Sequence, residues 1–130
     1  MEIASDRTTK YVTAVRRYMA DEGHATNAQI IEALRAQFPD VSATTIHRVT
    51  TRLHERGELQ LAPAAKDGAM RFDANVAPHD HFSCEHCGLL RDAQLSQMLG
   101  PLVEQAIGDG CSISGSLTVS GLCKTCRRYA

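Results

Sequence analysis

Ten residues near the middle of the chain, HDHFSCEHCG at positions 79–88, contain three side-chain types that bind metals: histidine, aspartate and cysteine. Cys84 and Cys87 form one CxxC pair, and Cys123 and Cys126 form a second pair near the C-terminus. Each pair presents two thiolates from one tight turn. Four thiolates at about 2.3 Å satisfy a tetrahedral zinc ion and leave no position open. The two pairs therefore predict a structural zinc site.

Two other chemistries also use paired cysteines. A thiol-disulfide oxidoreductase needs only one CxxC pair, so the second pair would have no purpose, and an iron–sulfur cluster is favoured less still. The fifth cysteine, Cys111, lies outside both pairs, and we expect it to be buried as a small apolar residue. His86 lies inside the first pair, and we expect its ring to face solvent.

The histidines that precede the first pair suggest a second metal site. On an extended segment His79 and His81 project to the same side, whereas Asp80 points away from them. Two neighbouring imidazoles can bind a metal. A lone histidine is nevertheless more often a surface or hydrogen-bonded residue, and an HxH pattern also arises by chance. The spacing by itself leaves both interpretations open.

The first half of the chain shows three helical segments. The first is predicted over residues 8–20 from apolar residues at helical spacing, and the third runs from an N-cap at Ser42 to a stop at Gly57. The second is expected to begin at Thr26 or Asn27 and to end at Pro39, and its apolar face comprises Ile30, Ile31, Leu34 and Phe38. The connection between the second and third helices is short, which predicts a helix-turn-helix.

Two strands should follow the third helix. ELQLA and AMRFDA are expected to form a hairpin around the AAKDG turn, which carries the Asp-Gly signal. Three helices and such a hairpin make a winged helix. The third helix also presents an outward face that suits the major groove of DNA, although a solvated face that binds nothing is the alternative. Its candidate DNA-binding residues are Thr44, Thr45, His47, Arg48, Thr51 and Arg52.

The second half should form a small sheet with one helix. The segment HFSCEHCGLLRDA is expected to form two strands joined by a knuckle, the tight turn that carries Cys84 and Cys87. The segment SISGSLTVSG is expected to form a final strand. The helix between them is expected to begin at Ser96 and to turn Leu99, Leu102, Val103 and Ile107 or Ala106 inward. So small a sheet cannot close a core alone, so we expect a homodimer formed through this half. The predicted class is α+β, with a winged-helix domain (1–73), a hinge (74–78) and a small α/β metal-binding dimerisation domain (79–130).

Composition is typical of a globular protein. The 130 residues are 43% hydrophobic and 22% charged, with a net charge of −1. We therefore expect a protein that neither coats nucleic acid indiscriminately nor associates with membranes. We also expect no signal peptide and a cytoplasmic location, in which cysteines serve as thiols or metal ligands.

The chain resembles the ferric uptake regulator family of bacterial metal-dependent repressors over essentially its whole length. The matching segments are TTIHRVTTRLHERGEL, RFD, HDHFSCEHCGLLRD and GLCKTC. The resemblance implies a homodimeric DNA-binding repressor, not an enzyme, that recognises a two-fold symmetric double-stranded operator.

Within the family, the chain looks most like the peroxide-sensing repressors. The resemblance implies that a regulatory Fe(II) or Mn(II) ion is bound by His24, Asp73, His79, His81 and Asp92. The two aspartates favour the peroxide-sensing branch over the iron-sensing branch, in which these positions are usually glutamate. The zinc-sensing branch usually has a sulfur ligand, which this set of five residues lacks. By the same analogy, oxidation would fall on His24 or His79 and would release the ion. An iron or manganese regulator without peroxide sensing would use the same ligands and remains the alternative.

Several features depart from the family's pattern. Gly115 replaces the histidine of a further metal site that many members have, Leu99 lies where the acidic partner of that site would be, and only Asp80 remains, so we expect this site to be absent. His47 replaces a tyrosine on the recognition helix, which puts the operator sequence in doubt. The N-terminal arm is short, which predicts fewer phosphate contacts. An RNA-binding knuckle is disfavoured because the chain lacks an aromatic platform.

Overall fold

The computed structural model describes the backbone of residues 6–128 and the side chains of residues 9–128. The chain divides into two compact units between Val76 and Ala77. Among the described residues, no helix has both the length and the apolar character needed to cross a bilayer. The predicted short N-terminal arm lies outside the described residues.

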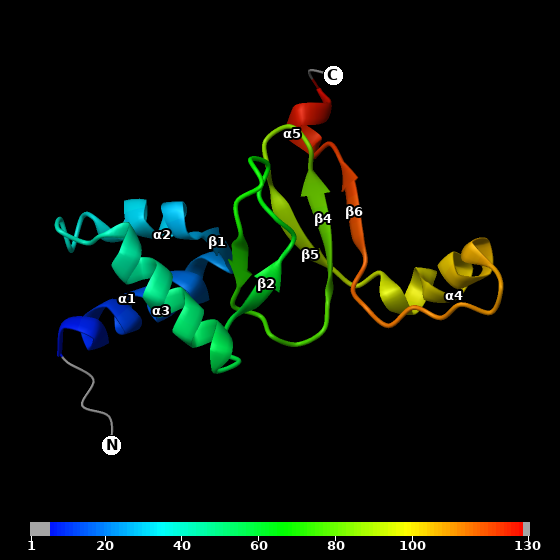
Figure 1. Cartoon of the computed structure of the whole chain (residues 1–130). Helices are drawn as coiled ribbons and strands as arrows, with labels where there is room; N and C mark the ends of the chain where they lie inside the picture. The colour runs from blue at the N-terminus through cyan, green and yellow to red at the C-terminus, as the bar shows by residue number, and fades with distance from the viewer. Residues whose placement is uncertain (1–5, 129–130) are drawn as a thin grey trace. The chain divides into compact units, whose positions relative to one another are not determined.

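The first unit contains three helices and a three-stranded sheet (Figure 1). In chain order its elements are α1 (Asp6–Glu22), β1 (His24–Thr26), α2 (Asn27–Leu34), α3 (Ala43–Glu55), β2 (Gln60–Ala62) and β3 (Arg71–Asp73). Two caps predicted from the sequence are confirmed. Thr26 forms a capping box with Gln29 at the start of α2, and the Ser42 hydroxyl accepts a hydrogen bond from the N–H of Thr45 at the start of α3.

The second helix is shorter than predicted. It ends at Leu34, and Phe38 lies beyond it in a turn in which its N–H donates to the carbonyl of Leu34. Pro39 disfavours helical backbone at Phe38, the residue before it, so the helix could not continue through Phe38. Phe38 still packs against the core, and its ring lies 5.1 Å from that of Tyr11. The prediction of its packing was right, and the prediction of its helix was wrong.

The apolar faces of the three helices meet in one core. The buried members on α3 are Ile46, Val49 and Leu53, as predicted, and Phe72 closes the core from the sheet. Thr50, also buried, donates to Asn27, which joins α3 to the start of α2. The side of α3 that faces away from this core carries the residues predicted from the sequence to bind DNA.

The wing contains one strand more than predicted. The expected hairpin is present, with β2 antiparallel to β3 and a turn in which Gly68 has a φ of +87°. In addition, β1 pairs with the other edge of β3, so the strand order is β1-β3-β2. This pairing places His24 directly opposite Asp73.

The second unit is a three-stranded sheet with two helices. Its strand order is β5-β4-β6, with β4 antiparallel to β5 and parallel to β6 (Figure 1). The final strand covers only the last part of the segment predicted for it. The elements are β4 (Asp80–Cys84), β5 (Leu90–Ala93), α4 (Ser96–Ile107), β6 (Thr118–Gly121) and α5 (Lys124–Arg127).

The helix α4 begins at Ser96 as predicted but does not bury the residues expected to face inward. None of its side chains is buried: Leu99 and Val103 are half-buried, whereas Leu102, Ala106 and Ile107 are exposed. The helix projects from the end of the sheet instead of lying across its face (Figure 1). Among the described residues of the single chain no second layer packs over α4, which is the physical reason why the prediction was wrong.

The second unit also has few buried apolar side chains. Among its described residues, only Cys84 and Leu90 belong to the buried hydrophobic set. Burial of this extent cannot offset the conformational entropy lost on folding. A unit of this kind requires a metal ion or a partner subunit for stability.

Candidate metal centres and recognition helix

The four cysteines of the two CxxC pairs converge in the second unit. The sulfur atoms of the four residues all lie within 4.8 Å of one another; the residues are Cys84, Cys87, Cys123 and Cys126. The Sγ atoms of Cys87 and Cys123 are 3.8 Å apart, too far for a disulfide bond. A zinc ion with bonds of about 2.3 Å has tetrahedral edges of about 3.8 Å, so the sulfur atoms fit zinc.

Backbone groups prepare one of these sulfur atoms for ionisation. The N–H groups of Cys87 and Cys123 donate to Cys84 Sγ and lower the pKa of this thiol to about 6. Burial raises the pKa of Cys126 to about 12. A divalent cation is what would hold all four sulfurs as thiolates, because metal binding displaces thiol protons.

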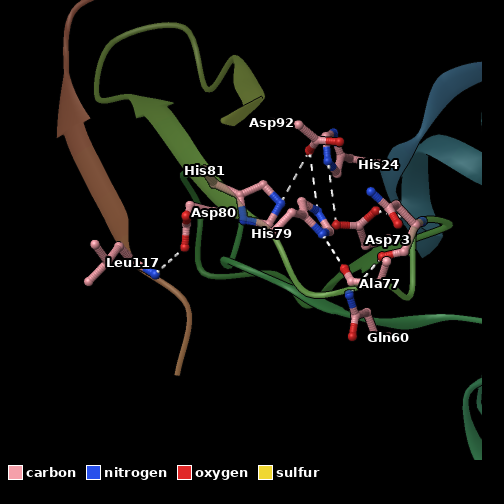
Figure 2. A network of polar contacts seen from close by, with 10 residues as sticks. His24, Gln60, Asp73, Ala77, His79, Asp80, His81, Asp92 and Leu117 are labelled. Carbon is pink, nitrogen blue, oxygen red and sulfur yellow. Dashed lines mark hydrogen bonds and ion pairs between the residues drawn. The ribbon is translucent and has the colours of Figure 1, made fainter. Parts of the chain in front are cut away.

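The histidine pair lies at the start of β4 in the same unit. His79 and His81 point to the same side, as predicted, and their rings are 4.5 Å apart (Figure 2). The Nε2 atom of each lies 3.4 Å from Oδ1 of Asp92, which stands opposite His81 on β5. Bonds of about 2.1 Å to one ion place neighbouring ligands about 3.0 to 3.4 Å apart. The three side chains therefore fit a single metal ion.

A carbonyl group sets the tautomer of the first histidine. Nδ1 of His79 lies 2.6 Å from the carbonyl oxygen of Ala77. Since a carbonyl only accepts, Nδ1 carries the hydrogen, and the lone pair of Nε2 points toward Asp92. Metal-binding histidines are commonly oriented by such a bond.

In the first unit, the β1–β3 pairing brings His24 to Asp73. Nε2 of His24 lies 3.6 Å from Oδ2 of Asp73 (Figure 2). The other carboxylate oxygen of Asp73 accepts a hydrogen bond from the N–H of Asn75. Asp73 is only 1% exposed. A buried carboxylate requires a positive partner or several donors, and a metal ion is one such partner.

The six candidate DNA-binding residues lie on one side of α3. Thr44, His47, Arg48 and Arg52 are exposed, and Thr45 and Thr51 are half-buried. A shallow groove on this side is lined by His47, Arg48, Thr51, Arg52 and Glu55. Glu55 was not among the candidates. Its carboxylate gives this end of the face a negative charge.

Comparison with known proteins decides the family. The model of the ferric uptake regulator family matches residues 5–114, which is most of the chain. The chain belongs to the ferric uptake regulator family. The resemblance stated from the sequence is thus confirmed.

Individual members of the ferric uptake regulator family agree with this assignment. The peroxide-responsive repressor PerR of Staphylococcus aureus is 29% identical over 126 residues, covering 95% of this chain and 84% of the repressor. The ferric uptake regulator of Helicobacter pylori has a TM-score of 0.71 at 20% identity, covering 91% of this chain and 80% of its own. The peroxide stress regulator of Campylobacter jejuni has a TM-score of 0.68 at 18% identity, covering 92% and 91%. These structures share the fold of this chain, which confirms the predicted α+β class with a winged helix.

The structure also tests the predicted burial of His86 and Cys111. His86 is exposed, as expected. Cys111 is also exposed, so the prediction that it would be buried was wrong. It follows Gly108 and Gly110, which both have positive φ, in a loop between α4 and β6 that leaves its side chain exposed.

The middle residue of the HxH pattern has a function in the fold that sequence reasoning missed. Asp80 points away from the two imidazoles, as predicted, but it is only 3% exposed. Its carboxylate accepts four hydrogen bonds, and these hold the pKa of Asp80 well below its usual range, with the N–H of Leu117 as the largest cause. Alternation along the strand indicated its direction, but no local signal identified its donors.

Proposed function

We propose that this chain is a metal-dependent transcriptional repressor that binds operator DNA as a homodimer in the cytoplasm and is released by peroxide. The observation that carries the proposal is the placement of both Nε2 atoms of His79 and His81 at 3.4 Å from one carboxylate oxygen of Asp92. The name of the Staphylococcus aureus relative, a peroxide-responsive repressor, supports the same function.

The regulatory ion in this proposal is Fe(II) or Mn(II), bound by His24, Asp73, His79, His81 and Asp92. Three imidazoles and two carboxylates form a nitrogen and oxygen set that suits these ions better than a thiol-seeking ion. If these five side chains held Fe(II), the ion would supply an electron to peroxide, whereas Mn(II) at the same ligands would not.

The two units have separate roles in this proposal. Residues 1–73 bind DNA, residues 74–78 form a hinge, and residues 79–130 bind metal and dimerise. Two ligands precede the hinge and three follow it, so an ion bound by all of them would restrain the hinge. Metal can favour one arrangement only by binding it more tightly than the others. We propose that this arrangement spaces two copies of α3 for a two-fold symmetric operator.

The zinc ion has a structural role in the same proposal, and the chain is not an enzyme. Cys84, Cys87, Cys123 and Cys126 would all be zinc ligands, which leaves no open coordination position and no free dithiol. A thiol-disulfide oxidoreductase would require one pair to cycle between thiol and disulfide. One zinc held per chain without rapid thiol titration would argue against that activity.

The peroxide reaction predicts a change of mass at specific histidines. After treatment with Fe(II) and peroxide, fragment-ion mass spectrometry should place one added oxygen atom on His24 or His79. Fragment ions are needed because the same tryptic peptides contain Met19, Cys84 and Cys87, which peroxide also oxidises. The Mn(II)-loaded protein is the control and should gain no oxygen on either histidine. If both samples remain unmodified while Fe(II) still promotes DNA binding, the chain is an iron or manganese regulator that does not sense peroxide.

The exposed residue Arg48 on α3 gives a prediction about DNA affinity. Arg48→Ala should weaken binding of the Mn(II)-loaded protein to a DNA fragment selected in vitro by about 5- to 150-fold, which corresponds to a base contact of about 1–3 kcal/mol. The matched control is Arg91→Ala, which removes an exposed arginine of β5 and should leave the affinity unchanged. Equal affinities of the two variants in fluorescence anisotropy would exclude Arg48 from the interface.

A further inference from the structure

The carboxylate of Asp80 joins three segments of the second unit. Oδ2 accepts from the N–H groups of Leu95 and Ser96 at 2.7 and 2.8 Å. Oδ1 accepts from the Ser96 hydroxyl at 2.8 Å. It also accepts from the N–H of Leu117 at 2.9 Å (Figure 2). Asp80 begins β4, Ser96 begins α4, and Leu117 immediately precedes β6. One buried side chain therefore connects the starts of all three elements.

These bonds supply a cap that α4 otherwise lacks. Leu95 occupies the N-cap position, and its side chain makes no capping hydrogen bond. The first N–H groups of a helix have no partner within the helix, and a negative charge near them is favourable. Asp80 provides both the acceptor and the charge from a distant position in the chain. The start of α4 is thus held by β4.

The same residue lies between the two candidate metal ligands of its strand. His79 and His81 flank Asp80 and project to the other side, toward Asp92. The N–H of His81 donates to the carbonyl of Leu117, whose own N–H donates to Asp80. A shift of Asp80 would therefore move the backbone that carries both imidazoles. Conversely, fixing the imidazoles would restrain Asp80 and its partners.

We propose that Asp80 is a positioning residue that couples the regulatory ion at His79 and His81 to the first turn of α4 and the start of β6. This inference rests on the proposed function, since it requires an ion at the histidine pair. Asp80 does not touch the ion. It acts by holding the two imidazoles at the spacing that an ion needs, and by passing the resulting restraint to Leu95, Ser96 and Leu117.

The test compares two substitutions in the full-length, zinc-loaded protein. Asp80→Asn preserves size but replaces one acceptor oxygen by an NH₂ group, which cannot accept from the N–H donors. The matched control is Glu104→Gln, because Glu104 also joins α4 to the loop before β6, through the N–H of Ile113, but has no bond to β4. Zinc content should remain at the wild-type level in both variants.

Two measurements are made on each protein. Mn(II) affinity should fall about 10- to 100-fold in Asp80→Asn, the range seen when groups that orient metal ligands are removed, and should be unchanged in Glu104→Gln. In hydrogen exchange, Mn(II) should slow the amides of Leu95, Ser96 and Leu117 in the wild type and in Glu104→Gln. It should have no such effect in Asp80→Asn.

Each remaining outcome has a defined meaning. Two results would overturn the inference and leave the proposed function standing. One is that Asp80→Asn binds Mn(II) with wild-type affinity. The other is that Mn(II) does not change the exchange rate of the three amides in the wild type. A wild type that binds no Mn(II) would overturn both the inference and the proposed function. If Asp80→Asn does not fold, Ser96→Ala removes only the hydroxyl bond. It should then weaken Mn(II) binding by less than the roughly 10- to 100-fold expected for Asp80→Asn, because three of the four bonds to Asp80 remain, and unchanged affinity would overturn the inference.

Discussion

His24→Ala is expected to abolish metal-dependent DNA binding while zinc and the homodimer persist. His24 provides the only imidazole that we propose as a ligand from the first unit, and Asp73 alone would be left there. The variant should lose the gain in operator affinity that Mn(II) produces, which is about 5- to 150-fold for a typical coupling of about 1–3 kcal/mol. A gel shift of wild type and variant with and without Mn(II) measures this gain.

The matched control for His24→Ala is His86→Ala. His86 is also a histidine, but its ring is exposed and lies outside the proposed ligand set. This variant should retain the full response to Mn(II). If His24→Ala shows the same metal-dependent shift as the wild type, an ion shared between the two units is the wrong mechanism, whatever the second unit binds.

Cys123→Ser is expected to remove zinc and to unfold the second unit. A serine hydroxyl does not replace a thiolate as a zinc ligand, and structural zinc contributes on the order of 10 kcal/mol in small domains. The second unit cannot absorb this loss, because Cys84 and Leu90 are the buried apolar residues among those described for it. Metal analysis should find much less than one zinc per chain, and circular dichroism should show loss of the sheet.

Cys111→Ser provides the control for this substitution. Cys111 is exposed and lies outside the cluster of four sulfur atoms. Its replacement should leave zinc content and thermal stability unchanged. Equal stability of Cys111→Ser and Cys123→Ser, with full zinc in both, would show that the four cysteines do not form a structural site.

Some features of this chain could be predicted because they depend on neighbouring residues. The hydroxyl of Ser42 caps α3, Gly68 permits the wing turn, and strand alternation turns His79 and His81 to one side and Asp80 to the other. Each depends on backbone geometry over a few residues, which sequence spacing specifies directly.

The family could also be predicted, because its motifs carry side chains at characteristic spacings. The match over residues 5–114 confirms it. The assignment of individual ligands and DNA contacts remains a prediction, since it rests on resemblance and on geometry within each unit. The experiments on His24, Cys123 and Arg48 are the means of testing it.

Other features were decided only by the tertiary structure. Pairing of β1 with β3 brings His24 to Asp73, and the donors to Asp80 come from Leu95, Ser96 and Leu117. Local patterns also predicted a buried Cys111 and inward residues on α4, and both predictions were wrong. The sequence by itself determined which way a side chain leaves its own strand or helix. Which distant segment meets that side chain depends on long-range pairing and packing, and local spacing contains no information about either.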